Sequence, residues 1–155
     1  MIAITNFDQL YGGPDVVANL HKQDSTLYSA LKAENNALIE AIRYENKADE
    51  NDAIVKFKQL RKNRKQLMLI NGYPEELIRF CDMQELTEGQ ARFIEYNVGL
   101  HLGLYEDTDS RWGDINIFGW FHATGFNLYN LLRKQGFNME EAYSGEIHPL
   151  DYYLK

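Results

Sequence analysis

The sequence has little of the residues that build disulfides, thiolate metal centres or frequent helix breaks. Its 155 residues include one cysteine, Cys81, and three prolines, at positions 14, 74 and 149. A single cysteine excludes an intrachain disulfide and a zinc site built on several thiolates, and it favours a reducing compartment. With so few prolines, little interrupts helices across the middle of the chain.

The sequence also lacks the signals of membrane insertion and of several cofactor-binding folds. Its longest strongly apolar run, Leu67 to Ile70, is far shorter than the roughly 20 residues that a membrane-spanning helix needs. The first ten residues have neither a basic leader nor a long apolar core. No P-loop, dinucleotide-binding or nucleophile-elbow motif is present. We therefore expect a soluble cytoplasmic protein without membrane contact, and we predict no cofactor.

What the sequence does contain is a helical period, clearest between about residues 24 and 71. Apolar positions recur at alternating steps of three and four in two runs, separated by the polar stretch NKADEND at 46–52. This rhythm is typical of helices that present one seam to a partner helix. It predicts a long antiparallel helical hairpin whose second arm is capped by Asp49, Asn51 or Asp52, the alternative being one bent helix. The predicted seam consists of Tyr28, Leu31, Asn35, Leu38, Ile42 and Glu45 in the first arm and Ala53, Phe57, Leu60, Arg64, Leu67 and Asn71 in the second.

Asn35 lies on the apolar seam of the first arm and has two interpretations. A polar residue at such a position can specify the register of helix pairing, at some cost in stability. Alternatively, the assigned helical phase is slightly wrong and Asn35 faces water. We favour the second interpretation.

After the hairpin, the sequence predicts a compact, aromatic-rich helical part over about residues 74–143. Pro74 opens a first helix. Thr87 and Gln90 form a capping box, which predicts that another helix begins there. That helix carries Ala91, Ile94, Val98 and Leu102 on one face, with Tyr105 as a further candidate.

A last helix is predicted at about 126–135, because Gly136 stands where a glycine commonly ends a helix. The aromatic residues between Tyr105 and Tyr129 are expected to form core, with Gly119 and Gly125 permitting close backbone approach. The fold class is therefore predicted to be all-α, and residues 1–155 are expected to form a single domain.

A basic island at residues 56–65 (KFKQLRKNRK) stands out in a chain of net charge −7. It holds six of the 16 basic residues and none of the 23 acidic ones. On a helix, Lys58, Arg61, Lys62 and Lys65 share one side, and we predict them as contact residues for an acidic partner. The alternative is intramolecular pairing of the island with acidic residues of the facing arm. Those acidic residues are Glu34, Glu40 and Glu45.

Two other groups are candidates for chemistry. Acidic residues cluster at 106–114, but the calcium-loop template fails because Arg111 and Trp112 occupy its fifth-ligand and glycine positions. No metal site is predicted. His122 lies among bulky rings that could shift its pKa, although histidines on apolar segments are more often hydrogen-bonded core residues. An enzyme using His122 with a nearby carboxylate is kept as an alternative, the carboxylates being Glu106, Asp107, Asp109 and Asp114.

With no catalytic motif, the sequence favours a non-enzymatic interaction or regulatory protein that docks onto a macromolecular partner. We expect that partner to be a protein, and inhibitors of nucleic-acid-handling complexes belong to this class because a bipolar charge pattern steers fast association. A homodimer through the helical hairpin is a further expectation. The main alternative is a nucleic-acid-binding protein that uses residues 56–65, although the net negative charge argues against general phosphate binding.

Overall fold

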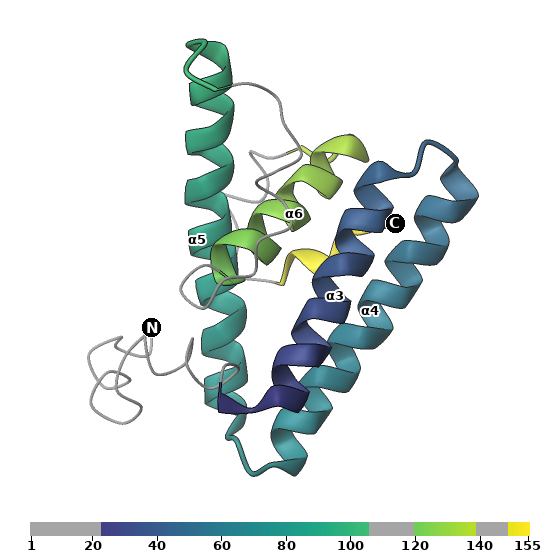
Figure 1. Cartoon of the computed structure of the whole chain (residues 1–155), viewed down its shortest axis with the longest axis vertical. Coiled ribbons are helices and arrows are strands. Elements are labelled where there is room, and N and C mark those ends of the chain that lie inside the picture. Colours follow the sequence, from purple (N-terminus) through teal and green to yellow (C-terminus); the bar gives the residue numbers. More distant parts are fainter. Residues whose placement is uncertain (1–22, 106–119, 139–148) are drawn as a thin grey trace.

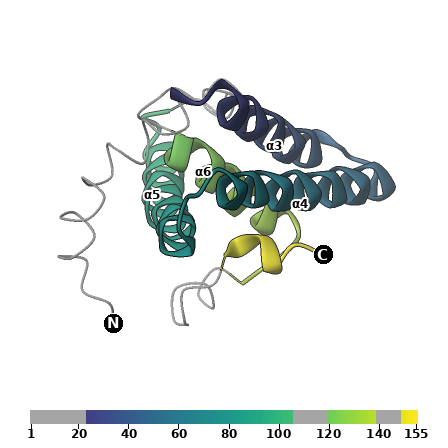
Figure 2. The same cartoon turned by 90° about the horizontal axis from the view of Figure 1, so that it is seen from below.

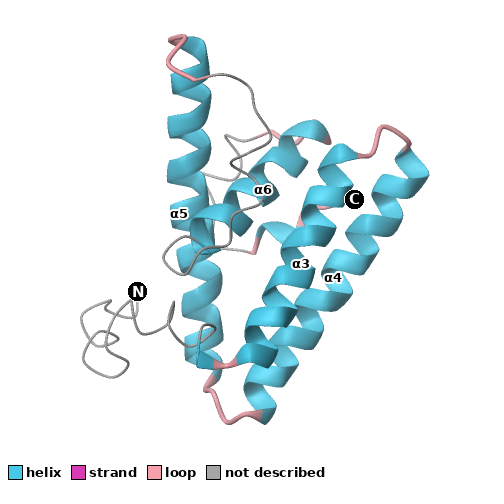
Figure 3. Cartoon of the chain, in the orientation of Figure 1, coloured by secondary structure: helices cyan, strands magenta, loops and turns pink. Residues whose placement is uncertain are grey.

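The predicted all-α fold is confirmed. The computed structural model describes residues 23–105, 120–138 and 149–155, and every regular element within these ranges is a helix (Figures 1 and 3). The elements are α3 (Ser25–Arg43), α4 (Lys47–Ile70), α5 (Glu75–His101), α6 (Trp120–Lys134) and the 3-10 turn η2 (Leu150–Tyr152).

Helices α3 and α4 form the predicted antiparallel hairpin (Figure 1). Its tip is shorter than predicted, because α4 begins at Lys47 with Asn46 as its N-cap. The Asn46 Oδ1 atom accepts a hydrogen bond from the Ala48 N–H at 2.8 Å. The predicted caps were therefore wrong. Asp49 and Glu50 lie instead in the first turn of α4, where a negative charge interacts favourably with the helix dipole.

Helix α5 is continuous over 27 residues, so the predicted helix start at Thr87 is wrong. The Thr87 hydroxyl donates to the backbone carbonyl of Met83 at 2.9 Å, one helical turn earlier. This bond satisfies the threonine side chain inside the helix, and the capping-box pattern has no helix end to cap. The chain enters α5 through a turn at Gly72, whose φ of +83° favours glycine.

Helix α6 is the central helix of the described structure. Figures 1 and 2 show it between α5 and the α3–α4 hairpin. From Trp120 to Leu132 every side chain except that of His122 is buried, as expected for a helix covered on all sides. It begins six residues before the predicted position and ends before Gly136, whose φ is +76°.

The predicted burial of the aromatic segment is confirmed for its described members. Trp120, Phe121, Phe126 and Tyr129 are all at most 5% exposed. Their rings pack against neighbours from α5, as in the edge-to-face pair of Phe126 with Tyr96 at 5.3 Å between centroids. Trp112, Phe118 and the predicted polar loop at 106–114 lie outside the described residues.

The buried apolar side chains form two clusters along the bundle. One lies at the end where α3, α5 and α6 begin and α4 ends, and it includes Leu27, Leu31, Met68, Leu77 and Trp120. The other lies toward the opposite end, and its main members are Leu38, Phe57, Phe93, Phe126, Tyr129, Leu150 and Leu154.

Helices α5 and α6 touch through glycine. A Cβ atom on Gly125 would collide with the backbone at Glu85 and Gly89, and one on Gly89 would collide with Gly125. The expectation that Gly125 permits close backbone approach is thus confirmed. This contact holds the middle of α5 against α6, and Glu85 lies at the same level.

No helix within the described ranges is both long and apolar enough to cross a membrane.

Replacing Gly125 with alanine is expected to lower the free energy of unfolding by about 1–3 kcal/mol, because the new methyl group forces α5 and α6 apart. Urea unfolding followed by far-UV circular dichroism measures this change. Gly72→Asn is the control, because a Cβ there meets nothing and asparagine tolerates a positive φ. Unchanged stability of Gly125→Ala would show that the two helices do not meet at this glycine.

Candidate functional site

Most cations of the basic island contact other groups of the same chain. Lys56 Nζ lies 2.9 Å from Glu40 Oε2, and Lys65 Nζ lies 2.8 Å from Asp82 Oδ2. Lys58 Nζ donates to the backbone carbonyl of Leu154 at 2.7 Å. These three lysines tie α4 to α3, to α5 and to the segment that carries η2.

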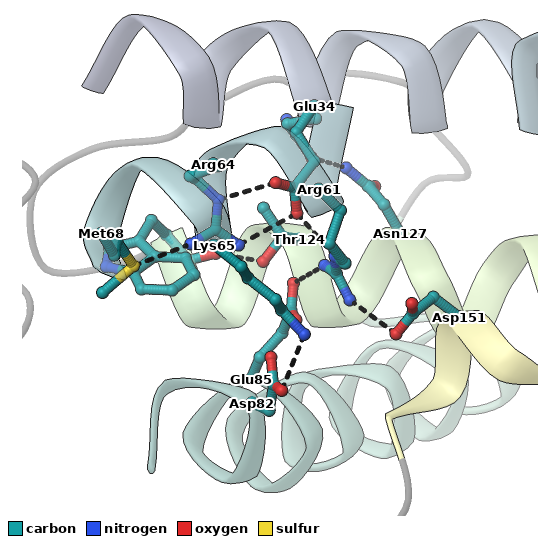
Figure 4. A network of polar contacts seen from close by, with 12 residues as sticks. Glu34, Arg61, Arg64, Lys65, Met68, Asp82, Glu85, Thr124, Asn127 and Asp151 are labelled. Atoms are coloured by element: carbon teal, nitrogen blue, oxygen red, sulfur yellow. Dashed lines mark hydrogen bonds and ion pairs between the residues drawn. The ribbon is translucent and has the colours of Figure 1, made fainter. Parts of the chain in front are cut away.

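Arg61 is buried, with 2% of its surface exposed, so it does not lie at the surface with the other three predicted contact residues, Lys58, Lys62 and Lys65. Its guanidinium group contacts three carboxylates from three different elements (Figure 4). Nε donates to Glu34 Oε1 and Nη2 donates to Glu85 Oε1, both at 2.7 Å, and Nη1 donates to Asp151 Oδ1 at 3.2 Å. Arg61 therefore joins α3, α4, α5 and η2 at one point.

Arg64, one turn further along α4, is equally buried and shares Glu34 with Arg61. Its Nε donates to Glu34 Oε2 at 2.7 Å, and its Nη2 donates to Glu34 Oε1 at 3.2 Å. Its guanidinium carbon lies 5.6 Å from the centre of the Trp120 ring. Of the six cations of the island, Lys62 is the exposed one for which the described residues provide no such contact.

The intramolecular alternative thus accounts for most of the island's charge, with Glu34 and Glu40 as two of the three predicted acidic partners. A direct contact of Lys58, Lys62 and Lys65 with an external partner stays a prediction.

This charge network lies between the two apolar clusters and receives polar side chains from all four helices. Glu34 and Asn35 come from α3, Arg61 and Arg64 from α4, and Glu85 from α5. Helix α6 contributes the buried Thr124 and Asn127. We call these seven residues the polar layer.

Asn35 belongs to the polar layer, which corrects our preference for an exposed Asn35. It is fully buried, and its Oδ1 accepts a hydrogen bond from Asn127 Nδ2 at 2.7 Å. The apolar phase of α3 was therefore assigned correctly. The asparagine is accommodated because α6 brings a matching amide to it.

The pKa values of the two buried glutamates move in opposite directions. Burial disfavours the charged form of Glu34, but the positive charges of Arg64 and Arg61 outweigh it and lower its pKa from 4.5 to about 2. Burial raises the pKa of Glu85 and the charge of Glu34 adds to that rise, while the charges of Arg61 and Arg64 only partly offset it. Of the two glutamates, Glu85 therefore takes up a proton more readily than an ordinary glutamate does.

The hydrogen bond between Thr124 and Glu85 partly opposes this rise, because it favours the charged carboxylate and so lowers the pKa of Glu85.

The structure gives little support to chemistry at His122 or Cys81. His122 lies on the outer edge of α6, its Nε2 atom 3.4 Å from Glu88 Oε2, with both side chains more than one third exposed. The four carboxylates predicted to assist His122 lie outside the described residues. Cys81 is buried, and burial raises the pKa of its thiol to about 12, so it is protonated at neutral pH.

No group of three or more potential metal ligands comes together within the part of the chain that the structure describes.

A feature that remains available for binding is an apolar stripe on the second half of α5. Ile94, Val98 and Leu102 follow one another at four-residue steps and are 46%, 51% and 62% exposed, and Leu104 just beyond them is 70% exposed. We call these four residues the α5 stripe. The opposite side of α5, with Phe93 and Tyr96, packs in the core. The sequence identified this apolar face from its period, but period alone does not say whether a face is covered.

No protein-family model matches this chain, and comparisons with curated proteins and with solved structures find no significant match either.

Replacing Arg61 with methionine is expected to lower the free energy of unfolding by about 3–5 kcal/mol, because Glu34 and Glu85 lose a buried counter-charge. Lys62→Met is the matched control, since Lys62 is the next residue on the same helix and is exposed, and its substitution should change stability by less than about 0.5 kcal/mol. Both values come from chemical unfolding at neutral pH. Equal effects of the two substitutions would refute the structural role of Arg61.

Acid is expected to remove the stability contributed by Glu34. Its folded-state pKa of about 2 lies below the ordinary 4.5, so its contribution is fully present above pH 4.5 and is lost as the pH falls toward 2. Glu50, which Lys47 and Lys134 hold near a pKa of about 2, acts in the same direction, whereas Glu85 acts in the opposite one.

The measurement is unfolding free energy against pH. Glu34→Gln should show a shallower loss below pH 4.5, and the control Glu40→Gln, at a largely exposed ion pair, should keep the wild-type slope. An unchanged slope in Glu34→Gln would contradict the assignment.

Proposed function

We propose that this chain is a non-enzymatic interaction protein that docks onto a protein partner through the α5 stripe. The observation that carries the proposal is the exposed run of Ile94 and Val98 on one face of α5, whose other face is core, continued by Leu102 at its C-cap and Leu104 just beyond. Single exposed apolar residues are ordinary, but a contiguous run of them marks an interaction surface more often.

The stripe suits a protein partner because its contacts are apolar and ordered along a helix. Residues at four-residue steps form a ridge, and such a ridge packs into the groove of a partner helix or between two helices. Glu95 and His101 lie beside the stripe, and it contains no lysine or arginine. A surface of this composition offers nothing to a phosphate backbone.

Nucleic-acid binding through residues 56–65 has less support. Affinity for phosphates rests on several cations that are free to replace counterions. In this chain Arg61 and Arg64 are buried against carboxylates, and Lys56 and Lys65 already form ion pairs. Lys62 alone is a weak basis for such binding.

The hairpin is also a less suitable docking surface than the sequence indicated. Its seam residues Leu31, Leu38 and Phe57 are fully buried within the single chain. A homodimer through that seam would have to open the core first, whereas the α5 stripe requires no rearrangement. A regulatory role fits this arrangement, because a protein can act by occupying a surface of its partner without any reaction of its own.

The test is a comparison of two equivalent substitutions. Val98→Glu places a charge in the middle of the stripe, and Val55→Glu places one at a 66% exposed valine of α4 that lies outside the stripe. Tagged wild-type protein is used to isolate bound proteins from cells. Each candidate partner is then purified, and its affinity for the wild type, for Val98→Glu and for Val55→Glu is measured by calorimetry.

We expect Val98→Glu to weaken binding of the true partner at least about tenfold and Val55→Glu to change it less than about twofold, because only the former buries a charge in the interface. Circular dichroism confirms that both variants remain folded. If the partners bind Val98→Glu with the same affinity as the wild type, the α5 stripe is excluded as the docking surface.

A further inference from the structure

The segment 149–155, which contains η2, is bound against α4 and α6 like a short peptide ligand (Figure 2). Leu150 and Leu154 are 2% and 3% exposed and belong to the apolar cluster of Phe57 and Leu128. Between them, Asp151 accepts from Arg61 Nη1 at 3.2 Å.

Backbone contacts complete the attachment of the segment. The Leu154 carbonyl accepts from Lys58 Nζ at 2.7 Å, and the Lys155 N–H donates to Gln135 Oε1 at 3.1 Å. The Tyr153 ring lies 4.8 Å from that of Phe137, centroid to centroid.

We propose that the surface of α4 and α6 beneath residues 149–155 is a second docking site, which accepts a partner protein's turn with the pattern Leu-Asp-x-x-Leu after displacing the chain's own segment. This surface is separate from the α5 stripe, so the inference does not depend on the function proposed above.

The chemistry that this site recognises follows from what it holds now. It takes two leucine side chains four residues apart, and it offers one guanidinium N–H of Arg61 to a carboxylate that lies between them in the sequence. The ammonium group of Lys58 is positioned for a backbone carbonyl at the end of the turn. Two of the four residues predicted as partner contacts, Lys58 and Arg61, thus form part of this site.

The segment can leave without dismantling the polar layer. The contact of Arg61 with Asp151, at 3.2 Å, is longer than its two contacts with Glu34 and Glu85, at 2.7 Å. Both shorter contacts remain when Asp151 departs, so Arg61 keeps its partners on α3 and α5. Helices α4 and α6 hold the remaining site in place.

The segment is also an incomplete ligand for its site. Tyr152 is 74% exposed, so this large ring gains little from the attachment. A partner turn with a shorter contact to the freed N–H of Arg61 Nη1, or with better buried side chains, can therefore compete. A second copy of this chain brings an identical segment and gains nothing over the one already bound, and two copies of net charge −7 repel each other.

The experiment uses the full chain and a fluorescent peptide with the sequence of residues 149–155, PLDYYLK. The double variant Asp151→Asn/Leu154→Ala weakens the internal segment, and Tyr152→Ala is the control in the same segment at an exposed side chain. Peptide binding is followed by fluorescence anisotropy. An internal ligand acts at an effective concentration in the millimolar range, so wild type and Tyr152→Ala should bind the peptide at least about tenfold more weakly than the double variant.

A peptide with asparagine in place of its aspartate should lose most of that affinity, because it no longer matches Arg61. Asp151→Asn alone, which removes only the 3.2 Å contact, provides a milder variant in case the double variant unfolds, and it should show an intermediate gain in peptide affinity.

Three results would overturn the proposal. The first is a folded double or single variant that takes up no peptide at concentrations up to about 1 mM, the weakest range of specific binding. The second is Tyr152→Ala binding the peptide as tightly as the double variant. The third is a concentration-dependent dimer of wild type, detected by light scattering and lost in the double variant, which would make a second copy the occupant.

Discussion

The bridge that Arg61 makes between Glu34 and Glu85 is the interaction on which the arrangement of the helices depends. Two buried carboxylates, one from α3 and one from α5, are both 2.7 Å from the same guanidinium group on α4. Shifting any of these helices by one turn would leave a charge unpaired in the interior, a change that costs several kcal/mol. The polar layer therefore helps to fix the register of the bundle, together with the close backbone contact of α5 and α6 at Gly89 and Gly125.

The sequence was sufficient to predict the parts of the fold that depend on local pattern. The hairpin followed from a period of three and four, the start of α5 followed from Pro74, and the end of α6 followed from Gly136. Local pattern failed at two positions for different reasons. The capping box at Thr87 predicted a helix start, but the threonine bonds back within a continuous helix. Asn35 lies on the apolar seam and was interpreted as facing water, but it meets Asn127, 92 positions away in the sequence.

The basic island shows why the candidate sites could be predicted only in part. A row of cations on one helix has the same sequence pattern whether it faces solvent or a set of carboxylates. The partners of Arg61 lie 24 to 90 positions away, on elements whose positions the sequence did not specify. The α5 stripe poses the converse problem, since Ile94, Val98 and Leu102 have the spacing of core residues and only the packing of the other helices shows that they are exposed.

The central position of α6 has a consequence for the synthesis of the protein. The hairpin and α5 precede α6 in the chain, yet many of their apolar side chains are covered by α6. Until residue 132 has left the ribosome, Leu38, Phe57 and Phe93 lack much of their covering, because the helix they pack against has not been completed. Chains emerging at about 5–20 residues per second would expose these surfaces for several seconds, and binding of a chaperone to the nascent hairpin would suit this interval.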